Sequence, residues 1–233
     1  MHVFPAFEFY ACGDHGFTLD FGQQIDININ GFVIHLFHQL QKNRRSYILD
    51  IIPAYSSITV VYNPLSFTKC NTNPESVIHE YFTNAILQTE NIQATASVDI
   101  IRIPVCYHPS LAPDLEPVCK YHNIDIDTLV TLHTQKTYRV FMNGFLPGFA
   151  YMGTVDDRIA TARHSNPRKK VAAGSLGIAG NQAGIYPFES PGGWQLIGRT
   201  SVSLFDLHSD NPCLLKPGDQ VQFYSIPIES FQS

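Results

Sequence analysis

Two glycine-rich segments in the C-terminal half hold the residue types best suited to bind a small ligand. Residues 144–153 (GFLPGFAYMG) place three aromatic side chains among three glycines and one proline. Glycine permits positive φ or close backbone approach, and aromatic rings supply rigid apolar walls. Residues 172–194 contain six glycines and two prolines, and small residues let backbone amides approach a carboxylate or phosphate. A packed turn at a barrel corner is the alternative interpretation.

Polar side chains in and around these segments predict a site for a small acid, such as a cyclic amide with a carboxylate. A guanidinium binds a carboxylate through two parallel hydrogen bonds, while amide and hydroxyl groups can contact the ring. The alternative is that the arginines pair with surface carboxylates. The predicted substrate-binding residues are Phe149, Tyr151, Arg168, Ser175, Gln182, Tyr186, Trp194 and Arg199.

Two residues are candidates for acid–base catalysis. Glu189 is the one acidic residue inside the second segment, which makes it the natural general base, although a solvated loop carboxylate is the alternative. His133 lies on the apolar face of an expected short helix and would point inward. A hydrogen-bonded core histidine is the alternative for that position.

Motifs that would define a self-contained site are missing from the sequence. Residues 174–177 (GSLG) lack the Gly-Lys-Ser/Thr ending of a phosphate-binding loop, and residues 177–180 (GIAG) do not satisfy the GxGxxG pattern of an NAD site. Ser175 does not sit in a GxSxG elbow. His35 and His38 lie three residues apart without a third ligand nearby, so we expect no metal site.

Composition favours a soluble, cytoplasmic globular protein. Apolar residues make up 44% of the 233 residues and charged residues 15%, and the formal charge of −5 argues against nucleic-acid or anionic-membrane partners. Five widely spaced cysteines without a CxxC pair fit reduced thiols. The N-terminus lacks the pattern of a signal peptide, and no apolar run reaches membrane-spanning length.

The first part of the chain predicts a compact α/β unit. Apolar residues spaced three and four apart indicate helices, and Pro53 divides a β-like run because it cannot donate to a strand ladder. The expected elements are strands at 6–11 and 17–21, a helix at 25–40, two strands within 47–62, and a helix that Asn73 caps and Pro74 begins.

The second part predicts short helices followed by β structure. The polar segment 88–97 places a domain boundary near Ile92, with domains at 1–92 and 93–233. Short β-like runs separated by glycine and proline are typical of a barrel or sandwich, so the fold class is α+β. The expected elements are a strand at 98–105, helices at 115–121 and 126–133, and β runs at 138–142, 193–197, 201–205 and 220–226.

Residues 138–153, 166–200 and 214–223 form three long motifs that resemble the KipI family, also called allophanate hydrolase subunit 1 or the B subunit of 5-oxoprolinase. The resemblance implies a small N-terminal α/β domain and a cyclophilin-like β-barrel. It further implies a cytoplasmic complex with a KipA-like C subunit and a LamB/YcsF-like A subunit, which converts 5-oxoproline, ATP and water to glutamate. ATP is thus expected at the level of the complex, with no cofactor assigned to this chain alone.

The same resemblance leaves a second function open. Members of the family are also known as inhibitors of a histidine kinase, and aromatic side chains such as Phe149 and Trp194 can serve as interface anchors as well as pocket walls. A prolyl isomerase activity would follow only from the likeness of the barrel to cyclophilins, and fold alone does not define activity.

Three alanines depart from the family pattern. Ala162 and Ala172 stand where the family usually has proline, and Ala183 stands where it usually has threonine. Each change keeps a small side chain, so we expect the backbone path to be retained with less rigidity and one hydroxyl fewer.

Overall fold

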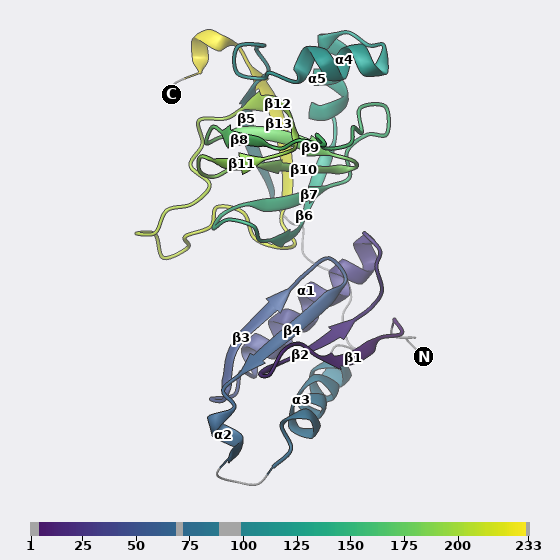
Figure 1. Cartoon of the computed structure of the whole chain (residues 1–233), viewed down its shortest axis with the longest axis vertical. Helices are drawn as coiled ribbons and strands as arrows, with labels where there is room; N and C mark the ends of the chain where they lie inside the picture. The colour runs from purple at the N-terminus through teal and green to yellow at the C-terminus, as the bar shows by residue number, and fades with distance from the viewer. Residues whose placement is uncertain (1–4, 69–71, 89–98, 232–233) are drawn as a thin grey trace. The chain divides into compact units, whose positions relative to one another are not determined.

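The computed structural model describes residues 5–68, 72–88 and 99–231. The chain divides into two compact units, Met1–Ser97 and Val98–Ser233 (Figure 1). The predicted boundary near Ile92 lies outside the described residues. Within the described part of the chain, no helix has both the length and the apolar character needed to cross a membrane.

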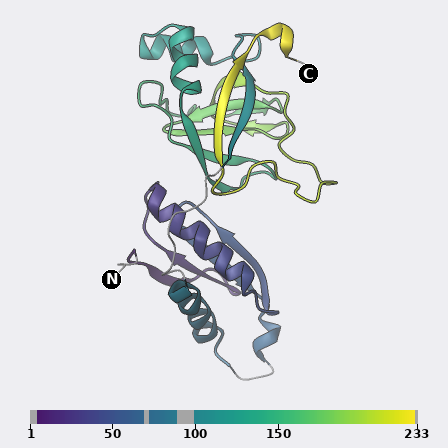
Figure 2. The same ribbon diagram turned by 180° about the vertical axis from the view of Figure 1, so that it is seen from behind.

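The N-terminal unit is a four-stranded antiparallel sheet in the order β1-β2-β4-β3, and helix α1 lies across one face of it (Figure 2). This arrangement confirms the predicted alternation of two strands and one helix. The short helix α2 is an addition that the sequence did not predict. The elements are β1 (Glu8–Ala11), β2 (Gly16–Asp20), α1 (Ile27–Lys42), β3 (Ile48–Pro53), β4 (Ser57–Tyr62), α2 (Leu65–Thr68) and α3 (Pro74–Gln88).

Local chemistry explains where the long helices begin. The Asp26 carboxylate caps α1 by accepting hydrogen bonds from the amides of Asn28 and Ile29, at 2.7 and 2.9 Å. The side chain of Asn73 accepts a bond from the Glu75 amide at 3.0 Å, as expected for a cap at the start of α3. Both helices bury one apolar stripe into a shared core with the sheet.

The C-terminal unit is a closed seven-stranded barrel in the order β10-β7-β6-β13-β5-β12-β9, which confirms the predicted α+β class with a barrel. Helix α4 packs against β12 and helix α5 against β13. The elements are β5 (Ile100–Cys106), α4 (Leu115–His122), α5 (Ile126–Thr134), β6 (Thr137–Asn143), β7 (Ala150–Gly153), β8 (Arg168–Val171), β9 (Ser175–Ala179), β10 (Gln182–Ile185), β11 (Ser190–Gly192), β12 (Gln195–Arg199) and β13 (Gln220–Ile226).

One expectation about this unit was wrong. Residues 201–205 do not form a strand, and their β character is limited to one bridge between Phe205 and Cys213. The glycine-rich segment 172–194 contributes strands to the barrel wall, where β9 and β10 form a hairpin. Glycine is normally unfavourable in strands, but here aromatic side chains from this segment and from Phe149 occupy the space beside the glycines.

The tight turn before β9 should be sensitive to any side chain. Gly174 has φ +79°, and a Cβ there would overlap the carbonyl oxygen of Thr200, whose amide bonds back to Gly174 at 2.9 Å. We expect Gly174→Ala to lower the free energy of unfolding of the barrel by roughly 2–5 kcal/mol, measured by denaturation followed through the single tryptophan, Trp194.

Gly180→Ala is the matched control for this change. Gly180 also has positive φ, at +60°, but open space surrounds its missing Cβ. Gly180→Ala should therefore lower the free energy of unfolding only through the backbone strain of a side chain at positive φ, by about 1–2 kcal/mol. Equal losses in the two variants would contradict the steric explanation.

Candidate functional site

Five aromatic side chains gather on the barrel and define what we call the aromatic cluster: Phe145, Phe149, Tyr151, Tyr186 and Trp194. The ring of Phe149 is central, with centroids 5.6, 4.8, 5.4 and 5.5 Å from the other four in that order. The interplanar angles are steep, which is the edge-to-face geometry that aromatic quadrupoles favour. The structure therefore brings together the four predicted aromatic residues and adds Phe145.

Exposure divides the cluster into an inner and an outer part. Phe149 and Tyr186 are buried, with 1% and 2% of their surface exposed, so they support the site from beneath. Tyr151 and Trp194 are half-buried. Phe145 is 59% exposed and has φ +66°, a conformation that is costly for a bulky residue. The outer rings are the ones that a ligand or partner can reach.

Glycines in the barrel wall make room for these rings. Gly177 and Gly184 are direct partners in the β9–β10 pair. A Cβ at Gly184 would lie 2.8 Å from the Phe149 ring and 3.0 Å from the Trp194 ring, and one at Gly177 would lie 2.9 Å from the Cβ of Trp194. The rings therefore lie directly on the backbone of the strands.

Arg168 lies at the edge of the aromatic cluster. Its strand partner is Gly192, and a side chain at Gly192 would overlap the Tyr186 ring. Burial raises the pKa of the Tyr186 phenol, and the positive charge of Arg168 opposes that rise. The Nη2 atom of Arg168 donates to Asp114 at 2.5 Å, whereas Nη1 is covered and has no hydrogen-bond partner among the described residues.

The carboxylate of Asp114 organises this edge of the site, although Asp114 is not among the site residues predicted from the sequence. Only 4% of the side chain is exposed. It accepts hydrogen bonds from Arg168, from Nε2 of His164 at 3.1 Å, and from the amide of Leu196 at 2.7 Å. Its position just before helix α4 makes it look like an ordinary helix cap, although it forms no side-chain cap bond. An aspartate at this position is common before a helix, so the sequence alone does not indicate these contacts.

The other predicted site residues make contacts of their own. Glu189 pairs with Lys170 at 2.8 Å on the surface, with 55% of the Glu189 side chain exposed. Arg199 donates from Nε to the Ala173 carbonyl at 2.9 Å and lies over the Phe231 ring. These contacts occupy both side chains without linking either to the aromatic cluster.

Ser175 and Gln182 belong to the barrel strands. Ser175 is buried at the start of β9, and its carbonyl accepts a hydrogen bond from the Tyr186 amide at 2.9 Å. Gln182 is half-buried at the start of β10, opposite Gly153. Their roles in substrate binding stay predictions.

His133 lies inside the barrel unit and is fully buried. Its Nδ1 is 2.8 Å from the Tyr107 hydroxyl, and its ring stacks on Phe223 at 4.9 Å. Burial lowers the pKa of the imidazole to about 3, so the ring is neutral near pH 7. The histidine points inward as predicted, and its ring neighbours are core residues rather than members of the aromatic cluster.

The three alanines that depart from the family pattern lie in the barrel unit. The side chain of Ala183 is buried in the main barrel core, so a threonine hydroxyl there would face the core rather than the aromatic cluster. The carbonyl of Ala162 accepts a bond from Gln195 Nε2 at 2.8 Å. Ala172 is half-buried in the turn between β8 and β9, where its carbonyl accepts from the Ser175 amide.

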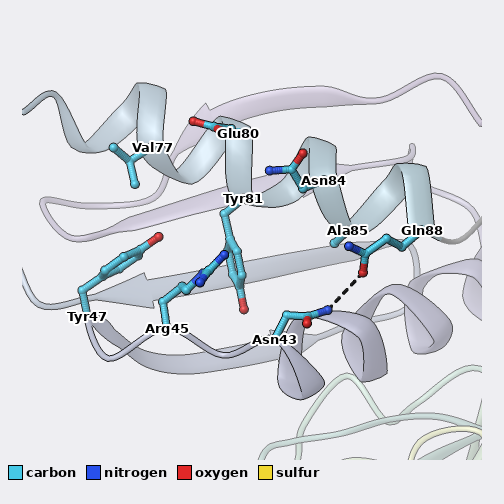
Figure 3. Close-up of a pocket in the computed structure, with 9 residues that line it drawn as sticks. All are labelled: Asn43, Arg45, Tyr47, Val77, Glu80, Tyr81, Asn84, Ala85 and Gln88. Atoms are coloured by element: carbon cyan, nitrogen blue, oxygen red, sulfur yellow. Dashed lines mark hydrogen bonds between the residues drawn. The ribbon is translucent and has the colours of Figure 1, made fainter.

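Two surface hollows are lined by residues outside the aromatic cluster. One of about 420 Å³ is in the N-terminal unit between α3 and the segment that follows α1 (Figure 3). Asn43 and Gln88 close one end of it through a hydrogen bond of 3.1 Å. The other, of about 520 Å³, is lined by residues of α4 and α5 such as Glu116 and Asp127. In the described ranges, no three His, Cys, Asp or Glu side chains converge as metal ligands would.

Comparison with known proteins gives this architecture a family. Residues 7–215 match the family described as "Carboxyltransferase domain, subdomain C and D". The B subunit of 5-oxoprolinase from Bacillus subtilis is 36% identical over 227 residues, which cover 95% of this chain and 93% of that protein. The protein of the same name from Escherichia coli O157:H7 is 40% identical over 76% of this chain and 77% of its own length. The chain belongs to the family of 5-oxoprolinase B subunits, as its sequence motifs predicted.

Solved structures share the fold of this chain. The crystal structure of TTHA0988 matches 91% of this chain with a TM-score of 0.78 at 30% identity, and the match spans 40% of that longer chain. The conserved uncharacterized protein PH0987 from Pyrococcus horikoshii matches 97% of this chain with a TM-score of 0.56 at 37% identity. The urea amidolyase of K. lactis shares the fold, with a TM-score of 0.73 at 21% identity over 15% of its length.

The close contact between rings and strands predicts a local effect of a single methyl group. Gly184→Ala should displace the Phe149 and Trp194 rings, change the emission of Trp194, and destabilise the barrel by roughly 1–3 kcal/mol. Gly31→Ala adds the same methyl group in open space on α1 and should leave Trp194 emission unchanged. Unaltered emission in Gly184→Ala would contradict the described packing.

The buried His133 predicts a pH dependence of stability. In the unfolded chain the imidazole titrates near pH 6.5, whereas the folded pKa is about 3, so between these values the unfolded state binds more protons. The free energy of unfolding attributable to His133 should therefore fall as pH is lowered through this window, by up to about 1.4 kcal/mol per pH unit. His133→Gln should remove that contribution, and parallel stability curves for wild type and variant from pH 7 to pH 4 would contradict it.

Proposed function

We propose that this chain is the B subunit of an ATP-dependent 5-oxoprolinase, which opens the lactam ring of 5-oxo-L-proline to give L-glutamate. The observation that carries the proposal is the match to a 5-oxoprolinase B subunit over 93% of that protein's length. The name of that relative assigns it to a multi-subunit enzyme. We therefore assign this chain to a complex with homologues of the A and C subunits.

The site chemistry is suited to this substrate. 5-Oxoproline is a small, flat ring that carries one carboxylate. The outer rings of Tyr151 and Trp194 provide apolar faces for the lactam, and Arg168 provides a cation beside them. The Nη1 atom of Arg168 is a buried donor without a hydrogen-bond partner among the described residues. A substrate carboxylate that reached this atom would supply the missing acceptor.

A lactam carbonyl is a poor electrophile, and this explains the need for ATP. Phosphorylation of the carbonyl oxygen would make the adjacent carbon susceptible to attack by water. The chain has no phosphate-binding loop of the Gly-Lys-Ser/Thr type. We therefore assign ATP to the assembled complex and the recognition of the ring and carboxylate to the aromatic cluster and Arg168.

Reconstitution tests the proposal. The chain is produced together with its A- and C-subunit homologues, and 5-oxoproline-dependent release of ADP and formation of glutamate are followed. Wild-type complex should show both. A complete complex that forms but releases no ADP in response to 5-oxoproline would contradict the proposal.

Arg168→Ala tests the carboxylate contact within the same assay. Loss of a hydrogen-bonded cation should lower kcat/KM for 5-oxoproline roughly 10- to 150-fold, mainly through KM. The matched control is Arg158→Ala, which removes another arginine that pairs with an aspartate, Asp156 at 2.9 Å, but is 68% exposed. Equal kinetics in the two variants would remove Arg168 from the binding site.

A further inference from the structure

The edge of the aromatic cluster contains a histidine whose surroundings fit proton transfer. His164 lies between β7 and β8, and its backbone amide donates to the Gly193 carbonyl at 2.7 Å, immediately before Trp194. This bond holds the residue beside the outer part of the aromatic cluster. One third of the side chain, 33%, is exposed. The imidazole is therefore partly open to solvent, on a residue whose backbone is hydrogen-bonded to the residue next to Trp194.

One ring nitrogen of His164 is committed to Asp114. Nε2 lies 3.1 Å from Oδ1 of the carboxylate, which also accepts from Nη2 of Arg168 at 2.5 Å and, through Oδ2, from the Leu196 amide. Three donors, one of them a cationic arginine, converge on a carboxylate of which only 4% is exposed. An ionised carboxylate is an acceptor only, so Nε2 must carry the hydrogen.

The tautomer decides what the other nitrogen can do. In a neutral imidazole with its hydrogen on Nε2, Nδ1 holds a free electron pair and acts as a base. Within the described part of the chain, Nδ1 has no hydrogen-bond partner. It is also not one of the buried polar atoms, so part of its surface is exposed. A carboxylate that orients a histidine in this way is the arrangement through which general bases are commonly held in enzymes.

We infer that His164 is the proton-transfer residue of this site and that Asp114 positions it; the inference rests on the proposed function. With the carbonyl oxygen phosphorylated, a water oxygen bonds to the carbonyl carbon and Nδ1 accepts one proton from that water. As the carbon–nitrogen bond breaks, this proton passes to the ring nitrogen, the remaining hydroxyl proton goes to solvent, and the products are an amine and an acyl phosphate. A second water hydrolyses the acyl phosphate to a carboxylate and inorganic phosphate, and the histidine has returned to its starting form.

Glu189, the base that the sequence suggested, is the natural rival. Its carboxylate pairs with Lys170 and is more than half exposed, and no buried group orients it among the described residues. His164→Gln should lower kcat of the reconstituted complex by roughly 100-fold or more with little change in KM for 5-oxoproline. Added imidazole should partly restore turnover in His164→Gly. Glu189→Gln should stay within about threefold of wild type.

Asp114→Asn tests the positioning role without removing the bond from the Leu196 amide. The asparagine amide would donate to Nε2 and place the hydrogen of His164 on Nδ1, so kcat should fall roughly 100-fold or more, as in the wrong-tautomer variant of a serine-protease triad. The same amide nitrogen would face Nη2 of Arg168, which bonds to the same oxygen, and Arg168→Ala measures the part of the loss that comes from that bond. The ¹⁵N NMR spectrum of the isolated chain should show His164 with hydrogen on Nε2 in wild type and on Nδ1 in Asp114→Asn. Trp194 emission reports whether the variant remains folded.

The outcomes separate the two proposals. Wild-type complex without 5-oxoproline-dependent ADP release defeats the proposed function itself. An active wild type with an equally active His164→Gln defeats only the present inference, as does hydrogen on Nδ1 in the wild-type chain. His108→Gln, which alters an exposed histidine that contacts Ser110, is the control and should leave kcat unchanged.

Discussion

The site of this protein depends on the absence of side chains at three positions in the barrel unit. Aromatic rings occupy the space that a Cβ would fill at Gly184 and Gly192, and the Cβ of Trp194 occupies it at Gly177. Edge-to-face ring packing stabilises the cluster by roughly 0.5–1.5 kcal/mol per pair beyond burial, which offsets the cost of glycine in the strands. The glycines therefore allow a rigid aromatic surface to form directly on the barrel wall. They do not mark a flexible loop.

The buried carboxylate of Asp114 is the second organising feature. Burial of an unpaired charge costs several kcal/mol, and this one is retained because an arginine, a histidine and a backbone amide all donate to it. The same bonds tie the start of α4 to β8, to β12 and to the segment that contains His164. One charge thus couples the integrity of the barrel to the orientation of the polar groups beside the aromatic cluster.

Family membership and site geometry inform different questions. The relatives assign the chain to the family of 5-oxoprolinase B subunits and its fold to one that the much larger urea amidolyase also contains. The geometry distinguishes among the predicted site residues. Arg168 lies at the edge of the aromatic cluster, whereas Arg199 and Glu189 make their contacts elsewhere on the surface. His133, which has the strongly lowered pKa, is a core residue whose neutrality is a consequence of burial.

The sequence by itself determined the elements whose apolar spacing is regular, including α1, α3, α5 and β13, because each buries one face and its period follows from its geometry. It also determined the family and four of the five residues of the aromatic cluster. Only the tertiary structure decided that the glycine-rich segment is strand and that Asp114 meets His164 and Arg168. Those residues lie 50 and 54 positions from Asp114, so no local pattern can relate them. Their meeting is set by barrel closure, which depends on pairings between distant strands.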